Sequence, residues 1–249
     1  MKLRSILARV GITIAALGIF LFLRIDLAAE IKQKVEAELR LRKSPGIITS
    51  YIRDHAVRKL QIGAGGSGKP GWLNTDIEPV DGVAYLDATK RFPLPDQSFH
   101  YIFSEEMFEH ITYEQGQSML RESYRILAPG GTMRLGTPDL LRFIALFQDA
   151  KTKEMSDYMP MKLAWHKWPN TPDTECYILN MVMREWGHQF IYTPKLLRAN
   201  LEAAGFVNIK QFAVSQSDHK ELRNMEDRAS WAIAGANAYE NMFFEATRK

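Results

Sequence analysis

The chain has 249 residues, a formal net charge of +3 at pH 7, and a composition that is 46% hydrophobic and 24% charged. This length suffices for one α/β domain with an additional segment, and the composition is that of a globular protein. The small net charge, without a basic patch interleaved with aromatic side chains, argues against nucleic acid as a partner. The single cysteine, Cys176, excludes a disulfide framework within the chain and a zinc site built from cysteines.

An apolar run without charge occupies residues 10–23 and is bounded by Arg9 and Arg24. It is shorter than the about 20 residues that a spanning helix needs, but residues 6–8 extend it and the flanking arginines can snorkel. We therefore predict an uncleaved, single-pass N-terminal membrane anchor, with a cleaved signal peptide and an interfacial or buried helix as alternatives. Basic residues are more numerous after the run, which predicts a cytoplasmic location for the rest of the chain.

The next segment has the pattern of an amphipathic helix over about residues 26–42. Leu27, Ile31, Val35 and Leu39 recur every four residues among charged positions. A helix lying along the membrane, a helix paired with a second copy and a solvated stalk all fit this pattern. Ser44-Pro45-Gly46 then predicts a break, so that residues 1–45 form the anchor and amphipathic helix and residues 46–249 form a separate domain.

A glycine loop joins two short predicted strands, residues 60–62 and 73–76. Gly63, Gly65 and Gly68 have the spacing of a dinucleotide-binding fingerprint. Lys69-Pro70-Gly71 follows directly, which disfavours a long helix at this point and removes the helix dipole that would receive a pyrophosphate. The loop therefore fits a cofactor that has an adenosine but no phosphates, for which S-adenosylmethionine is the candidate. Asp76, at the end of the second strand, is the predicted acceptor for the ribose hydroxyls; a plain turn with Asp76 as a cap is the alternative.

The remaining pattern alternates strands with helices. Strands are predicted at residues 82–87, 100–104, 132–136, 206–214 and 229–234, and helices at residues 112–127, 137–148 and 193–204. Such alternation specifies parallel βαβ units with right-handed crossovers, and the two late strands predict an antiparallel pair at the end of the sheet. The fold class is therefore α/β, with a mostly parallel sheet of seven strands.

Residues 151–186 are less regular and rich in large side chains, and Pro160, Pro169 and Pro172 interrupt them. Because this segment lies between sheet elements, we predict a substrate cap over residues 151–190 that closes the strand ends. The alternative is that its aromatic side chains simply complete the core.

Several segments together resemble the class I S-adenosylmethionine-dependent methyltransferases, in particular the type 11-like group. They follow in order at Leu60–Gly65, Pro70–Asp76, Asp87–Ala88, Phe92–Phe99, Phe108–His110, Leu127–Gly131, Trp186–Tyr192 and Ala204–Phe206. The resemblance covers about residues 60–212. It implies a Rossmann-like, doubly wound, seven-stranded sheet with helices on both faces, to which the N-terminal membrane helix is added.

The resemblance also implies a set of cofactor-binding positions. They are Gly63, Ala64, Gly65, Asp76, Asp87, Ala88, Ser104 and Glu105. The glycine loop would lie beneath the methionine part of the cofactor, the first acid would hold the ribose, and the second acid with the alanine after it would meet the adenine. The serine and glutamate at the end of the fourth strand would border the methyl group. One departure is the short gap without a helix before Asp76.

Methyl transfer from a sulfonium is an in-line displacement for which the protein mainly supplies alignment. A hydroxyl acceptor also needs a base, and His188 is the preferred candidate, with Glu109 and His110 as further catalytic candidates. Local backbone contacts alone are the alternative role for these histidines. A second alternative is a site for magnesium, manganese or zinc made by Glu106, Glu109 and His110 with His188 as the fourth ligand; local caps or ion pairs compete with it, and we assign no metal ligand.

We therefore predict a membrane-anchored S-adenosylmethionine-dependent methyltransferase that modifies a small-molecule, glycan or lipid-like acceptor at oxygen. Two alternatives remain open. One is an oxidoreductase that uses a nicotinamide dinucleotide, which the Lys69-Pro70-Gly71 segment disfavours. The other is a non-catalytic membrane-bound scaffold, which the presence of both Asp76 and Asp87 disfavours.

Overall fold

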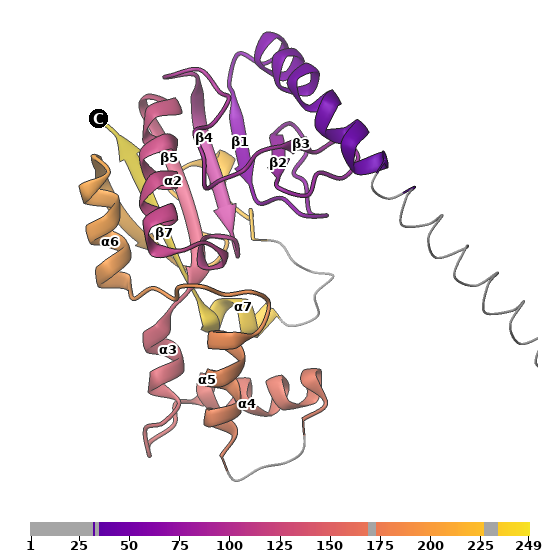
Figure 1. Ribbon diagram of the computed structural model, residues 1–249. Helices are drawn as coiled ribbons and strands as arrows, with labels where there is room; N and C mark the ends of the chain where they lie inside the picture. Colours follow the sequence, from indigo (N-terminus) through magenta and orange to yellow (C-terminus); the bar gives the residue numbers. More distant parts are fainter. Residues whose placement is uncertain (1–31, 33–34, 169–172, 227–233) are drawn as a thin grey trace, which may run out of the picture.

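The computed structural model describes residues 32, 35–168, 173–226 and 234–249, which form a seven-stranded sheet flanked by helices (Figure 1). The strand order is β3-β2-β1-β4-β5-β7-β6. The strands are β1 (Lys59–Ile62), β2 (Leu73–Asp76), β3 (Ala84–Tyr85), β4 (Phe99–Glu105), β5 (Leu127–Pro138), β6 (Phe206–Phe212) and β7 (Asn241–Arg248). Pairing is parallel from β3 to β5, and β7 pairs antiparallel with both β5 and β6. The predicted mostly parallel sheet with an antiparallel end is therefore confirmed.

The labelled helices are α2 (Tyr113–Ile126), α3 (Leu140–Ala145), α4 (Lys153–His166), α5 (Thr174–Arg184), α6 (Pro194–Ala203) and α7 (Ala234–Glu240), with the short 3-10 turns η1 (Phe108–His110) and η2 (Lys220–Leu222). They include the three that the sequence predicts, which correspond to α2, α3 and α6. Local chemistry sets the bounds of α2, because Thr112 and Gln115 form a reciprocal capping box at its start. The Thr193 hydroxyl caps the start of α6 by accepting from the N–H of Leu196, and Pro194 lies in the first turn.

One face of the sheet is apolar and is covered by helices. Leu60 of β1, Ile102 of β4 and Met133 of β5 are aligned across the sheet and are fully buried. They share one core cluster with Leu120 of α2 and Leu201 of α6. In Figure 1 these two helices lie side by side on the sheet. Burial of side chains of this size contributes about 1.5–3 kcal/mol each, so this face holds the main core.

The opposite face contains a buried ion-pair triad. Arg134 of β5 is paired in register with Phe103 of β4, and its guanidinium binds the carboxylates of Glu226 and Glu245. In the described part of the chain, residues 213–226 with η2 pack on this face. The doubly wound arrangement with helices on both faces stays a prediction.

A helix over residues 35–54 precedes the sheet and is packed onto it. The predicted break at Ser44-Pro45-Gly46 is wrong, since the helix continues through these residues. Ser44 is buried, and its hydroxyl accepts a 2.8 Å hydrogen bond from the backbone N–H of Tyr85. Ile48 and Tyr51 join the main core cluster. These tertiary contacts outweigh the weak helix propensity of proline and glycine.

The segment between β5 and β6 is more helical than the sequence predicts. The helix expected over residues 137–148 is shorter, because Pro138 still belongs to β5 and Asp139 caps α3. The irregular segment expected over residues 151–186 contains α4 and α5, and Pro160 lies inside α4. In Figure 1 the helices α3, α4 and α5 lie beyond the carboxyl ends of β4 and β5.

Two predictions fall largely on residues outside the described part. The apolar run over residues 10–23 is one of them, and none of the helices in the described ranges combines the length and apolar character needed to cross a bilayer. The other is the last strand predicted at residues 229–234. Residues 229–233 are outside the described part, Ala234 begins α7, and the final strand of the described sheet is β7.

Candidate active site

The glycine loop has the conformation that its sequence predicts. Gly63 and Gly65 have positive φ angles of 73° and 50°, a region that favours glycine. A Cβ atom on Gly63 would lie 2.5 Å from the Cγ atom of Met107, so the loop also passes close beneath the segment that follows β4. Residues 63–72 are all described and contain turns but no helix. The loop therefore lacks the helix N-terminus on which a dinucleotide pyrophosphate would bind.

Asp76 fixes this loop to the end of β2. One carboxylate oxygen accepts a 2.7 Å hydrogen bond from the backbone N–H of Gly65, and the other accepts a 2.9 Å bond from the N–H of Glu78. A carboxylate has about four acceptor positions, so two remain for ligand hydroxyls. The structure thus places Asp76 beside Gly63, Ala64 and Gly65, and its contact with a ribose stays a prediction.

Asp87 follows β3 and is held as an ionised acceptor. Its Oδ1 atom accepts bonds from the N–H and the hydroxyl of Thr89 at 2.9 and 2.6 Å, and its Oδ2 atom lies 3.0 Å from the Nζ atom of Lys90. Burial raises the pKa of Asp87, but the hydrogen bonds from Thr89 and Lys90 outweigh it and leave the pKa below its usual value. Ala88 beside it is buried. Contact of these two residues with an adenine stays a prediction.

This pKa shift predicts a stability change with pH. Because the folded-state pKa of Asp87 is lowered, its contribution to stability is complete above the unfolded pKa of about 3.9 and is lost as the pH falls through the lower folded-state pKa. Replacing Asp87 with asparagine is expected to reduce the free energy of unfolding more at pH 6 than at pH 3. Urea unfolding of both proteins at the two pH values measures this, and an equal difference at both would contradict it.

Ser104 and Glu105 end β4 and are both buried. Glu105 accepts a 3.0 Å hydrogen bond from the side-chain amide of Asn237 in α7, and Asn241 donates to the Asn237 carbonyl oxygen at 2.6 Å. The Ser104 hydroxyl has no hydrogen-bond partner within the described residues. The carboxyl end of β4 therefore presents one hydroxyl and one oriented carboxylate next to the glycine loop.

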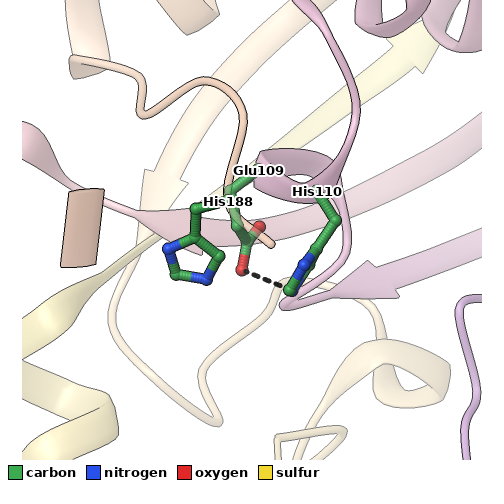
Figure 2. Close-up of side chains that lie close together, drawn as sticks. All are labelled: Glu109, His110 and His188. Carbon is green, nitrogen blue, oxygen red and sulfur yellow. Dashed lines mark ion pairs between the residues drawn. The ribbon is translucent and has the colours of Figure 1, made fainter. Parts of the chain in front are cut away.

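Three further side chains converge beyond the ends of β4 and β5. Figure 2 shows the carboxylate of Glu109 between the imidazole rings of His110 and His188. One ligand-type atom from each lies within 4.8 Å of the other two, and the two rings meet edge to face at 4.8 Å between centroids. Glu109 and His110 come from η1, whereas His188 follows α5. Trp186 and Gly187, both with positive φ, turn the chain between α5 and His188.

The cluster is built from the three residues predicted as catalytic. Glu109 is fully buried, its Oε2 atom accepts a 2.9 Å bond from the hydroxyl of Thr137, and its Oε1 atom lies 4.0 Å from Nε2 of His110. The Nδ1 atom of His188 lies 2.6 Å from the carbonyl oxygen of Val182. Because that oxygen only accepts, Nδ1 must carry the proton, and Nε2 of the neutral ring keeps its lone pair.

A match to a known family covers part of this edge of the sheet. A family model described as a methyltransferase domain matches residues 72–135, which extend from the residue before β2 into β5. These residues include Asp76, Asp87, Ser104 and the Glu109–His110 pair. The match supports methyltransferase activity with S-adenosylmethionine as the cofactor, which implies a methyl acceptor as the substrate.

No curated protein sequence matches the chain significantly. Among solved structures, the chain is similar to an S-adenosylmethionine-dependent methyltransferase of Thermotoga maritima that is described as a possible histamine N-methyltransferase. The two share 15% sequence identity with a TM-score of 0.45, and the match covers 88% of this chain and 96% of that one. A second similar structure is an S-adenosylmethionine-dependent methyltransferase of Mesorhizobium loti, with 16% identity, a TM-score of 0.46, and coverage of 81% and 98%. A third is phosphoethanolamine N-methyltransferase 2 of Haemonchus contortus in complex with S-adenosyl-L-methionine, with 14% identity, a TM-score of 0.40, and coverage of 77% and 48%. Likenesses of this degree carry no information about the acceptor.

The pKa values of both histidines in the Glu109–His110–His188 cluster lie below the ordinary value. Burial is the main cause for each ring. The neighbouring His188 lowers the pKa of His110 further, while a backbone hydrogen bond with Trp186 opposes this. A backbone hydrogen bond with Val182 and the charge of Glu240 oppose the lowering at His188. Both rings are therefore neutral at pH 7, the form in which an imidazole can accept a proton or bind a cation.

Aromatic side chains of the predicted cap lie over one side of His188. The Trp186 ring is 5.6 Å from His188 and 5.7 Å from His166 between centroids. The Nζ atom of Lys162 lies 5.8 Å from the Trp186 ring and pairs with Glu240 at 2.5 Å. α4 and α5 share a second core cluster with residues of α3 and α7, so their large side chains complete a core, which is the alternative that the sequence left open. A role of this cap in binding the acceptor stays a prediction.

The sequence analysis does not identify two residues that orient side chains of the candidate site. Thr137 was assigned to the start of a helix, although its place at the carboxyl end of a predicted strand is a signal that could have marked it. Asn237 has no such signal, because its partner Glu105 lies 132 residues earlier in the chain. Glu106, considered as a metal ligand, is outside the Glu109–His110–His188 cluster.

Proposed function

We propose that this methyltransferase transfers the methyl group of S-adenosylmethionine to a hydroxyl oxygen of a small-molecule, glycan or lipid-like acceptor. The observation that supports oxygen as the acceptor atom is the convergence of Glu109, His110 and His188 at the carboxyl ends of β4 and β5. A hydroxyl must lose its proton as it attacks, whereas a neutral amine does not need this before attack. The neutral ring of His188, with Nε2 unprotonated, is the group assigned to take that proton.

The reaction balances with the groups at this edge. The hydroxyl proton passes to the site, the oxygen forms a bond to the methyl carbon, and the bond from that carbon to sulfur breaks. Its electron pair returns to the sulfonium, which becomes the neutral thioether of S-adenosylhomocysteine. The protein contributes alignment by placing the glycine loop, the end of β4 and the histidine pair at one edge.

The acceptor is tested with the full-length chain in detergent. Methyl-labelled S-adenosylmethionine is incubated with the protein and with fractions of a cell extract that separate polar small molecules, glycans and lipids. We expect label in one of these fractions as an ether that survives mild acid and base. Label that is found only on nitrogen, or only on protein, would contradict the proposal.

The cofactor-binding role of Asp76 gives a prediction. Replacing Asp76 with alanine removes the acceptor for both the loop N–H of Gly65 and the ribose hydroxyls, so we expect S-adenosylhomocysteine to bind more weakly by about 1–3 kcal/mol. Isothermal titration calorimetry measures this. Asp81→Ala is the matched control, because Asp81 is exposed and its ion pair is with Arg40 in the preceding helix, away from the glycine loop. Equal affinities for wild type and Asp76→Ala would show that Asp76 does not hold the ribose.

We further propose that the apolar run over residues 10–23 anchors the methyltransferase to a membrane, with the domain on the cytoplasmic side. The sequence supports this through the uncharged run and the excess of basic residues after it. We expect the full chain to remain with membranes after an alkaline wash and a variant without residues 1–31 to be released. Release of both proteins would contradict an anchor.

A further inference from the structure

We propose that Glu109, His110 and His188 bind one divalent cation of the zinc class. Two imidazole nitrogens and one carboxylate oxygen are the donor set of catalytic zinc sites, which leave a fourth position open. The imidazoles favour zinc and neighbouring transition metals over magnesium or calcium, whose preferred ligands are oxygens. The three donor atoms come from two separate segments that the fold brings together (Figure 2).

Each donor is already oriented by a second contact. The Val182 carbonyl accepts from Nδ1 of His188, which leaves Nε2 as the donor atom. The Thr137 hydroxyl holds the Oε2 atom of Glu109, and the His110 ring makes a backbone hydrogen bond with Trp186. Carbonyl and hydroxyl contacts of this kind are the usual outer layer of a metal site, where they fix the tautomer and the direction of each ligand.

The distances fit a site that closes slightly around its ion. The donor atoms lie within 4.8 Å of one another, and the Nε2 atom of His110 is 4.0 Å from Glu109. Tetrahedral zinc with bonds of about 2.1 Å places its ligand atoms about 3.4 Å apart. His110 is one-third exposed, and a small shift of its ring toward the fully buried Glu109, whose position is set by the Thr137 contact, would bring the two donor atoms to this spacing.

The open position gives the ion a part in the reaction, and this half of the proposal rests on the proposed function. The ion would hold an acceptor hydroxyl at this position and would lower its pKa, so that its proton could leave to water near neutral pH. The acceptor would then be a hydroxyl that can bind a cation. In the metal-loaded protein His188 would be a ligand, and the role of His188 as a base would apply to the metal-free protein.

Metal binding is tested on the untagged full chain in detergent, separately from activity. After removal of bound metal with a chelator, Zn²⁺ is titrated by competition with a chromophoric chelator, and Co²⁺ is used as a spectroscopic probe. We expect one ion per chain and a Co²⁺ absorption band of a site with nitrogen and oxygen ligands. Glu109→Gln and His188→Gln should abolish both signals. The isosteric Thr137→Val keeps all three ligands and should weaken Zn²⁺ binding by about 10–100-fold.

The control variant is His219→Gln, since His219 lies on the opposite face of the sheet beside Tyr101 and Thr132. It should bind Zn²⁺ as the wild type does. Binding of less than one ion per chain, or binding that Glu109→Gln and His188→Gln leave unchanged, overturns the metal site. Label transfer by the metal-free protein would also overturn a catalytic ion while leaving the proposed function intact. Stoichiometric Zn²⁺ binding without methyl transfer to any hydroxyl supports the site and overturns the proposed function.

Discussion

Replacing Arg134 with methionine is expected to lower the free energy of unfolding by about 3–5 kcal/mol. The Arg134 side chain is fully buried, and it binds the buried carboxylates of Glu226 and Glu245. It also donates to the Gln216 carbonyl at 2.8 Å. Without the guanidinium, two carboxylates remain in the interior without the cation that stabilises their charge. Glu226 keeps the hydrogen bond that it accepts from the backbone N–H of Ser215. Urea unfolding followed by circular dichroism measures the loss.

A triple variant provides the matched control. Replacing Arg134 with methionine and both Glu226 and Glu245 with leucine removes the charges together, so stability should return close to that of the wild type. Arg53→Met is a second control, since Arg53 and its partner Asp54 are exposed and their pairing contributes little. If Arg134→Met were as stable as the wild type, the triad would not hold residues 213–226 on the sheet.

Replacing His188 with glutamine is expected to lower the rate of methyl transfer by about 10²–10⁴-fold. Glutamine can still donate to the Val182 carbonyl, but it supplies no basic nitrogen to the acceptor or to a cation. Because His188 follows α5 and is not part of the glycine loop, the affinity for S-adenosylhomocysteine should stay unchanged. Single-turnover transfer to the labelled acceptor fraction measures the rate, and calorimetry measures the affinity.

His219→Gln should leave both quantities as they are in the wild type. A rate within threefold of the wild type for His188→Gln would remove His188 from the chemistry. An equal loss of cofactor affinity would instead place its effect in folding or in the cofactor pocket. The two measurements together therefore separate a catalytic role from a structural one.

The parts of this fold that were predicted correctly carry their signals locally. The capping box of Thr112 and Gln115, the Thr193-Pro194 start of α6 and the glycines after β1 are each determined by residues within a few positions. The same holds for the carboxyl ends of β1, β2 and β4. The predicted catalytic residues Glu109, His110 and His188 were found from motif contexts, and the structure brings them together.

The parts that were missed depend on distant contacts. β7 does not alternate cleanly, because Glu245 points into the sheet to meet Arg134, 111 residues earlier. The continuation of the first helix through Pro45 depends on the hydrogen bond between Ser44 and Tyr85, 41 residues apart. The sequence predicts that Pro160 interrupts regular structure, yet α4 continues through Pro160 and packs against α5 and α7. Local propensity yields to tertiary packing at each of these places.

The position of β7 has a consequence for how the protein becomes active during synthesis. β7 comes after β6 in the chain but lies between β5 and β6. Until β7 leaves the ribosome, β6 has no strand to pair with and Arg134 lacks Glu245. Pairing of this kind between distant segments forms slowly. A nascent chain can therefore form the glycine loop early, whereas β6 and the ion-pair triad join the sheet only after β7 has been made.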